Sequence, residues 1–274
     1  MARARLAEPA PPLAHALAPL LRTARFGRAV RAFEETPSTN AEATRWAEAG
    51  APEGALVMAD HQTAGRGRYG RSWVDAPGQG LLFSLVLRPA LPPDALGLLP
   101  LMAGVAVAEA AAPHVAPHAP RLKWPNDLLF GGRKAGGLLA EARTSGDGRP
   151  VVILGVGLNV NEQTLPPEIE DRATSLALVL GRPLDRAALL AGVLLALERR
   201  YDALLGGGRA ALLAAFEAHA AGLGKAVTVS FPHGPRPALT GTFAGLAPDG
   251  ALRLATRDSE VHVHAGEVTL ALAG

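Results

Sequence analysis

The residue pattern of the chain changes at Lys225, and this change limits what the chain can fold into. Before Lys225, short apolar runs alternate with helical stretches that end at glycines. After it, apolar and polar residues alternate in short runs at regular spacing, and Pro248-Asp249-Gly250 is a strong turn signal. The pattern therefore predicts an α/β (α+β) fold, in which a sheet covered by helices is followed by a small β-barrel of roughly 50 residues.

We expect three segments along the chain. Residues 1–28 are rich in alanine, proline and arginine, and we expect them to form a poorly ordered or partly helical N-terminal extension. Residues 29–222 are expected to form the larger domain. Residues 223–274 are expected to form the barrel, with Gly222-Leu223-Gly224 at the connection.

Hydrophobic periodicity and turn signals predict the elements of both domains. Strands are predicted at 28–35, 55–59, 80–87, 121–124, 128–130, 137–142 and 151–159, and in the barrel at 227–229, 239–244, 251–255 and 260–264. Helices are predicted at 39–49, 98–112, 173–180, 186–205 and 209–221. The first helix has Ser38 as its N-cap and ends before Gly50.

The composition excludes several classes of protein. Cysteine is absent, which excludes a disulfide framework, a thiolate nucleophile and a zinc site built on cysteine. The formal net charge of +2 is too balanced to indicate nucleic-acid binding by itself. No uninterrupted apolar run reaches the ~20 residues of a membrane span, and no secretory signal follows the basic N-terminus. We therefore expect a cytoplasmic protein that does not bind a membrane.

Lysine is rare in this chain, and its placement is informative. There are three lysines against 24 arginines, and Lys123 and Lys134 lie within eleven residues of each other. Arginine is a planar fork, whereas lysine is a compact charge that can approach a single reacting centre. Chance placement is the alternative, but both lysines lie in dense polar motifs, and we infer that they serve chemistry.

The sharpest signal is the segment Gly65–Arg71, which contains three glycines and three arginines. Glycines let a loop bring backbone N–H groups close to a ligand, and arginines donate two hydrogen bonds at once to phosphate or carboxylate. The segment follows a predicted buried strand, and we interpret it as a loop that can move and that encloses an anionic ligand. A flexible arginine–glycine tract that binds RNA loosely is the alternative.

Three further motifs carry polar side chains. Trp73 is either a platform for a nucleobase or a core aromatic residue. The segment Lys123–Asp127 joins an ammonium, an amide and a carboxylate at a turn, and Asp127 is a base, a Mg²⁺ ligand or an Asx-turn residue. Asn159 follows an apolar strand and is a candidate for contact with a phosphate or ribose, although the surrounding glycines are not a dinucleotide fingerprint. The histidines lack carboxylate partners at metal-ligand spacing, so the ligands of any metal are unknown.

Taken together and in this order, these motifs resemble those of the biotin protein ligases, the biotin–[acetyl-CoA-carboxylase] ligases. The glycine–arginine motif with its flanking Gln62 and Trp73 is highly specific, and Tyr69 is a departure because many members have a polar or basic residue there. The matching pieces cover about 36 to 180 and are Ser38-Thr39-Asn40, Gln62 to Trp73, Lys123 to Asp127, Lys134-Ala135-Gly136-Gly137, Gly155 to Val160 and Ala173-Thr174-Ser175-Leu176.

The resemblance implies a fold and a reaction. The family has a mixed-sheet catalytic domain of the biotin/lipoate ligase type, followed by an SH3-like β-barrel. Its members join biotin to ATP in the presence of Mg²⁺, giving biotinyl-5′-AMP, and then biotinylate a lysine of a biotin carboxyl carrier protein of acetyl-CoA carboxylase or a related carboxylase. Some members also bind DNA through an N-terminal domain. About 30 residues precede the first strand here, so we expect no DNA binding. The family also implies a homodimer through a sheet edge.

The resemblance also assigns roles to residues. Lys134 would bridge the biotin carboxylate and the α-phosphate, Arg68 would hold the loop over the adenylate, and Asp127 would act as a base, so these three are the expected catalytic residues. Biotin is expected to contact Ser38, Thr39, Asn40, Gln62, Gly65, Arg66, Gly67, Arg68, Lys134 and Gly137. ATP and the adenylate are expected to contact Arg66, Arg68, Trp73, Asn126, Lys134 and Asn159.

Other interpretations of the same sequence predict different ligands. A lipoate ligase or octanoyl transferase is expected to share the fold, and the glycine–arginine loop with Gln62 and Trp73 argues against it. A nucleic-acid-binding regulator would use the arginine loop and would show salt-dependent affinity. A sensor without catalysis is disfavoured because Lys134, Arg68 and Asp127 are all present.

Overall fold

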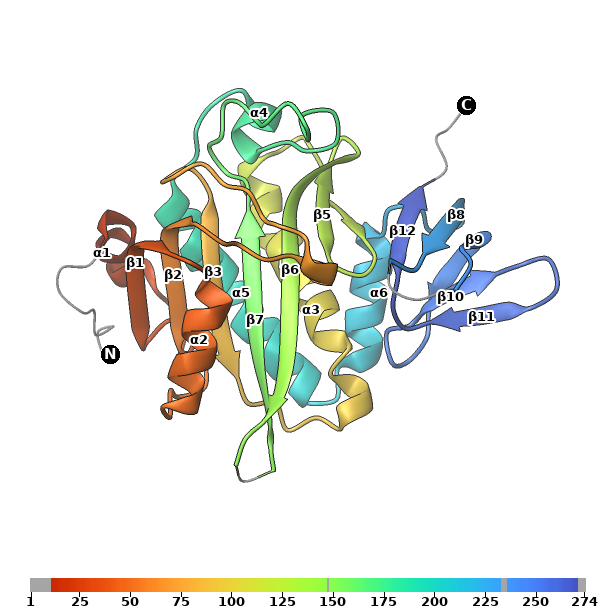
Figure 1. Cartoon of the computed structure of the whole chain (residues 1–274), viewed down its shortest axis with the longest axis horizontal. Coiled ribbons are helices and arrows are strands. Elements are labelled where there is room, and N and C mark those ends of the chain that lie inside the picture. The colour runs from red at the N-terminus through yellow and green to blue at the C-terminus, as the bar shows by residue number, and fades with distance from the viewer. Residues whose placement is uncertain (1–10, 147, 233–235, 271–274) are drawn as a thin grey trace.

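The computed structural model describes residues 11–146, 148–232 and 236–270 and contains two sheets (Figure 1). The larger sheet has seven strands in the order β1-β2-β3-β7-β6-β5-β4. The strands β1 and β2 run parallel, and the other neighbours run antiparallel, so the sheet is mixed. The strands are β1 (Val30–Thr36), β2 (Leu56–Gln62), β3 (Leu81–Leu87), β4 (Arg121–Lys123), β5 (Asp127–Phe130), β6 (Arg133–Thr144) and β7 (Pro150–Leu158).

Helices cover both faces of this sheet (Figure 1). On one face α2 (Thr39–Glu48) packs against β2, β3 and β7. On the other face α3 (Leu98–Ala111) packs against α5 (Arg186–Leu205), and α6 (Arg209–His219) packs against α3. The remaining helical segments are α1 (Pro12–Leu17), α4 (Leu176–Leu180) and the 3₁₀ turns Ala18–Leu20, Arg68–Gly70, Pro93–Ala95 and Ala112–His114. The predicted mixed α/β (α+β) architecture is confirmed.

The helix α3 is apolar on all sides because protein surrounds it. By length and composition alone, the segment Pro93–His114 that contains it could cross a membrane. Its most apolar stretch is 67% buried inside the molecule, between the larger sheet and α5. A helix that is hydrophobic all round is expected in such an enclosed position, and burial in the core explains its composition.

The C-terminal part forms a second, five-stranded antiparallel sheet with the order β11-β10-β9-β8-β12. Its buried side chains continue the core of the larger sheet through α6. Within the described residues β11 and β12 are edge strands that do not pair with each other, so the expected barrel is an open sheet here. The last strand was not predicted. The strands are β8 (Ala226–Ser230), β9 (Leu239–Leu246), β10 (Leu252–Ala255), β11 (Glu260–Val263) and β12 (Glu267–Leu270).

Residues 11–28 are partly helical and packed on the core, which agrees with the helical alternative predicted for residues 1–28 and not with poor order; residues 1–10 lie outside the described residues. The helix α1 (Pro12–Leu17) packs against α5, and the side chains of Leu17 and Phe26 are buried. The carboxylate of Glu198 in α5 accepts hydrogen bonds from the backbone N–H groups of Ala24 and Arg25, both at 2.7 Å. The prolines suggested disorder. The segment is ordered because it buries apolar side chains and because the Glu198 carboxylate accepts hydrogen bonds from its backbone N–H groups.

We expect Phe26 to be essential for the packing of this segment. It is 0% exposed, and its ring centroid lies 5.6 Å from that of Tyr201. Phe26→Ala should lower the free energy of unfolding by about 3–5 kcal/mol, because it leaves a cavity in the core. Leu20→Ala is the matched control, since Leu20 is 40% exposed in the same segment. Urea denaturation measures both variants, and equally small losses would contradict the packing described.

Candidate active site

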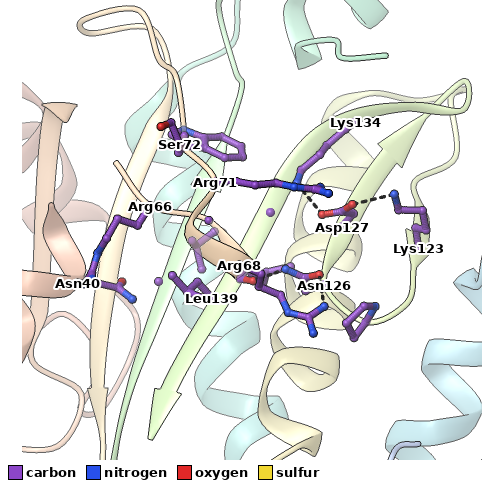
Figure 2. A pocket seen from close by; sticks show the side chains of 18 of the residues that line it. Asn40, Arg66, Arg68, Arg71, Ser72, Lys123, Asn126, Asp127, Lys134 and Leu139 are labelled. Atoms are coloured by element: carbon purple, nitrogen blue, oxygen red, sulfur yellow. Dashed lines mark hydrogen bonds and ion pairs between the residues drawn. The ribbon is translucent and has the colours of Figure 1, made fainter. Parts of the chain in front are cut away.

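A cavity of about 130 Å³ opens on the face of the larger sheet that carries α2 (Figure 2). Its walls come from the start of α2, the end of β2, the loop 66–73, the β4–β5 turn, the middle of β6 and β7, and β12. Twelve of the residues predicted for the site line it, namely Ser38, Thr39, Asn40, Gln62, Arg66, Gly67, Arg68, Trp73, Asn126, Asp127, Lys134 and Gly137. Gly65 and Asn159 do not line it.

Glycines in β6 and β7 form the floor of the cavity. A Cβ atom at Gly155 would lie 2.1 Å from Oδ1 of Asn40, and one at Gly157 would lie 2.7 Å from the ring of Trp73. A Cβ atom at Gly137 would lie 3.3 Å from the same ring. These positions carry glycine because the amide and the indole ring lie directly against the backbone of the sheet.

The glycine–arginine loop is a closed turn. The N–H of Gly67 donates to the carbonyl of Arg71 at 2.7 Å, and the N–H of Trp73 donates to the carbonyl of Gly65 at 2.9 Å. Tyr69 has φ 59°, in the left-handed region that favours glycine. Gly65 is buried at the base of the loop, where its Cβ would lie 2.8 Å from the carbonyl oxygen of Trp73. Gly65 therefore shapes the loop and does not face the cavity.

Arg68 connects the loop to both domains. Its guanidinium donates to Oδ1 of Asn126 at 3.4 Å, to the carbonyl of Gly266 at 3.3 Å and to the Tyr69 hydroxyl at 2.9 Å. Glu267, which follows Gly266 at the start of β12, lines the cavity and forms an ion pair with Arg71 in the loop. The C-terminal sheet thus forms one wall of the cavity. The alternation of apolar and polar residues in β12 could have predicted the strand, but it carries no signal for this contact.

Asp127 lies between two lysines (Figure 2). Its Oδ2 is 3.0 Å from Nζ of Lys123, and its Oδ1 is 2.6 Å from Nζ of Lys134. The β4–β5 hairpin places Lys123 opposite Asp127, and a bulge in the β5–β6 pairing brings Lys134 to the same group. Burial alone would raise the pKa of Asp127, but the two ammonium groups outweigh it and hold the pKa below its usual range. The carboxylate is therefore a counter-ion that holds protons weakly.

Polar groups at the start of α2 form the opposite end of the cavity. Oε1 of Gln62 accepts hydrogen bonds from the backbone N–H of Thr39 at 2.7 Å and from the Thr39 hydroxyl at 3.1 Å. The amide nitrogen of Gln62 is left to donate elsewhere. Ser38 occupies the predicted N-cap position without a capping hydrogen bond, and its hydroxyl lines the cavity with no partner among the described residues.

Three predicted nucleotide contacts have different positions. The Asn126 amide nitrogen donates to the carbonyl of Leu138 at 2.6 Å, so this side chain positions the turn and Arg68. Asn159 is 7% exposed and donates to the carbonyl of Thr174 at 3.0 Å, which gives it a structural role outside the cavity. Nε1 of Trp73 is buried and has no hydrogen-bond partner among the described residues. Of the three, Trp73 and Asn126 line the cavity, and Asn159 does not.

A group of buried acids near the stem of the loop was missed by the sequence analysis. The Asp75 carboxylate lies 2.8 Å from Nδ1 of His61. Glu162 is 4% exposed. Burial raises the pKa of Glu162 to about 7, and the charge of Asp75 acts in the same direction. No group of three or more His, Asp or Glu side chains in the described part of the chain is arranged to hold a metal ion.

Comparisons with known proteins agree with this site. The model of the biotin/lipoate A/B protein ligase family matches residues 32–159, and that of the biotin protein ligase C-terminal domain matches residues 222–270. The bifunctional ligase/repressor BirA of Bacillus subtilis is 36% identical over 256 residues, which cover 91% of this chain and 76% of BirA. The biotin–[acetyl-CoA-carboxylase] ligase of Mycobacterium tuberculosis is 37% identical over 239 residues, covering 85% and 86% of the two chains.

A solved structure agrees as well. The biotin protein ligase from Aquifex aeolicus in complex with biotin and ATP aligns with a TM-score of 0.77 at 31% identity, covering 88% of this chain and 98% of that chain. The chain therefore belongs to the biotin protein ligase family, and the resemblance inferred from its motifs is confirmed.

The raised pKa of Glu162 predicts a pH-dependent cost in stability. An unfolded glutamate has a pKa of about 4.3, so between pH ~4.3 and 7 the folded chain keeps a proton that the unfolded chain has released. The free energy of unfolding therefore falls as pH rises through this window. Glu162→Gln should raise it by on the order of 3 kcal/mol at pH 8, with little difference near pH 4.5.

Urea denaturation across this pH range measures the effect of Glu162→Gln. Glu170→Gln is the control, because Glu170 is exposed and lies in the same segment after β7. A gain for Glu162→Gln that is the same at every pH would contradict the assigned protonation.

Proposed function

We propose that this chain is a biotin–[biotin carboxyl carrier protein] ligase, which forms biotinyl-5′-AMP from biotin and ATP and then biotinylates a carrier lysine. The observation that supports this most is that one cavity joins a polar recognition end to a cluster of cations. The polar end contains Ser38, Thr39 and Gln62, and the cationic end contains Lys134 and the arginine loop. The names of the relatives and the biotin and ATP bound in the Aquifex ligase support the same reaction.

The polar end suits the ureido ring of biotin. Among the described residues, the hydroxyl of Ser38 makes no capping bond, and the bonds from Thr39 use the oxygen of Gln62 and leave its amide nitrogen to donate. A substrate that fills them is favoured strongly over one that leaves them unpaired. Lipoate has no ureido group, and for this reason the lipoate ligase alternative is not favoured.

The cationic end suits the joining of two anions. The biotin carboxylate attacks the α-phosphorus of ATP, a new O–P bond forms, and pyrophosphate leaves with the electrons of the broken bond. Lys134 would exchange its contact with Asp127 for the two substrates, while Arg66 and Arg68 would neutralise phosphate oxygens as the loop encloses them. Preorganised positive charge of this kind stabilises the developing charge in the transition state.

We assign Asp127 a positioning role that differs from the predicted base. A general base has to accept a proton, and the two neighbouring lysines hold the pKa of this carboxyl below its usual range. Its contacts with Lys123 and Lys134 instead fix where the lysine charges lie before substrates bind. In the second step the carrier lysine attacks the acyl carbon of the mixed anhydride, and AMP leaves.

Magnesium is expected to enter with the nucleotide. Mg²⁺ is commonly held by substrate phosphates, water and one or two carboxylates, and it neutralises phosphate charge. The acidic side chains that line the cavity are Asp127 and Glu267, and both are already paired with cations. These residues fit an ion carried by the phosphates better than a site prebuilt by the protein. The cytoplasmic location, the homodimer and the absence of DNA binding stay predictions.

Biotin-dependent exchange between ATP and pyrophosphate tests the proposed function. With Mg²⁺ present, the purified chain should exchange labelled pyrophosphate into ATP when biotin is added, and lipoate should give no exchange. Addition of a biotin carboxyl carrier protein should then yield the biotinylated carrier, detected by mass. Exchange with lipoate alone would indicate a lipoate ligase. No exchange with either ligand would reject the ligase assignment.

Lys134 is expected to be the most sensitive single cation. Lys134→Ala should lower the rate of adenylate formation by on the order of 10²–10³, because the charge that bridges the two anions is lost. Lys225→Ala is the matched control, since Lys225 is exposed and lies outside the cavity. Single-turnover formation of biotinyl-5′-AMP measures both. A normal rate for Lys134→Ala would show that another group bridges the substrates.

A further inference from the structure

Tyr69 has a side chain that the roles assigned above do not use and a backbone conformation that does not suit it. The segment Arg68–Arg71 is a tight turn, closed by the N–H of Arg71, which donates to the carbonyl of Arg68 at 3.3 Å. Its two central residues both have positive φ, 59° at Tyr69 and 72° at Gly70. Turns of this type favour asparagine followed by glycine, and a bulky side chain at the first of these positions is unusual.

The Tyr69 side chain lies against the guanidinium of its neighbour Arg68. Cζ of Arg68 is 4.7 Å from the centroid of the Tyr69 ring, and Nη2 of Arg68 donates to the Tyr69 hydroxyl at 2.9 Å. An aromatic face attracts a guanidinium, and a hydrogen bond from a charged donor is stronger than one between neutral groups. Strained backbone persists only where surrounding contacts hold it. We therefore attribute the tyrosine at this position to its contacts with Arg68.

These contacts hold Arg68 at a wall that two cavities share. Arg68 lines the active-site cavity and also a second cavity of about 200 Å³, which lies beside the turn at Asp249. Nη1 of Arg68 donates to Asn126 at 3.4 Å and to Gly266 at 3.3 Å, and Figure 2 shows Arg68 beside Asn126. Both distances are long for hydrogen bonds. The shorter bond to Tyr69 is therefore the contact that contributes most to the direction of the guanidinium.

We propose that Tyr69 is a positioning residue that holds the Arg68 guanidinium at the shared wall, where it retains the phosphate of the adenylate. This role rests on the proposed function. An arginine side chain loses conformational entropy when it is fixed, and contacts that fix it before the substrate binds reduce that cost at binding. Without the tyrosine, the guanidinium adopts more directions, the two cavities are less well separated, and biotinyl-5′-AMP escapes sooner.

The rate at which biotinyl-5′-AMP leaves the protein tests this role. Labelled adenylate is formed on the protein in a single turnover, and an excess of unlabelled biotinyl-5′-AMP then prevents the labelled molecule from rebinding. Tyr69→Phe keeps the ring and loses the hydroxyl, and we expect release on the order of fivefold faster. Tyr69→Asn loses both contacts, and we expect release on the order of twentyfold faster.

Tyr69→Asn also separates the side chain from the backbone. Asparagine followed by glycine is the favoured pair for this turn, so the variant should keep the shape of the loop. If Tyr69 only shaped the loop, the variant would retain the adenylate as well as the wild-type chain does. Trp46→Leu is the control, because it removes an arginine–aromatic contact outside the cavity, where Cζ of Arg31 lies 4.4 Å from the ring centroid. It should release the adenylate at the wild-type rate.

A double variant tests whether Tyr69 acts through Arg68. In the Arg68→Ala background, Tyr69→Phe should change the release rate by less than about twofold, because the group that Tyr69 positions is gone. An equal effect of Tyr69→Phe in both backgrounds would overturn the inference. Release at the wild-type rate from either single Tyr69 variant would overturn it as well. A wild-type chain that forms no biotinyl-5′-AMP is a separate outcome, because it rejects the proposed function and this role with it.

Discussion

The close approach of side chains to the backbones of β6 and β7 is the constraint on which the site depends. Gly155 admits the amide of Asn40, and Gly157 admits the ring of Trp73, at distances that leave no space for a Cβ atom. The strands β6 and β7 pair over nine positions and form the floor, while the loop that leads to Trp73 is held by its own turn and by the contacts of Arg68 and Arg71. Because the glycine floor and the loop together fix the shape of the cavity, the cavity favours recognition of a rigid bicyclic ring.

Each carboxylate in or beside the cavity is paired with at least one cation. Asp127 binds two lysines, Glu267 pairs with Arg71, and Glu141 lies near Arg66. Each cation keeps a partner until a substrate anion replaces it, which limits the cost of gathering like charges in one place. This pairing supports the proposal that the acids of the site act by holding the cations in place and not by accepting protons.

Local patterns predicted most of the fold, because α5 is a long helical segment and β7 is a short apolar run, and both have clear ends. The resemblance to the biotin protein ligases, and not the local patterns, predicted which motifs meet in the cavity. Contacts across long sequence separation were not predictable from local patterns. Glu198 anchors the N-terminal segment from α5, and Gly266 reaches Arg68 from the second sheet. Asn159 was expected to contact the nucleotide, but it does not line the cavity. Its amide donates to the carbonyl of Thr174, a partner that only the folded chain brings near.

The cavity lining holds five cationic side chains and two carboxylates, an excess of three positive charges, whereas the whole chain carries a formal charge of only +2. The attraction for anions is thus concentrated at one opening and is not spread over the surface. Steering of this kind weakens as ionic strength rises, with a range of about 8 Å at physiological salt. Changes to charges on distant surfaces can therefore alter the solubility of this protein without weakening its capture of anionic substrates.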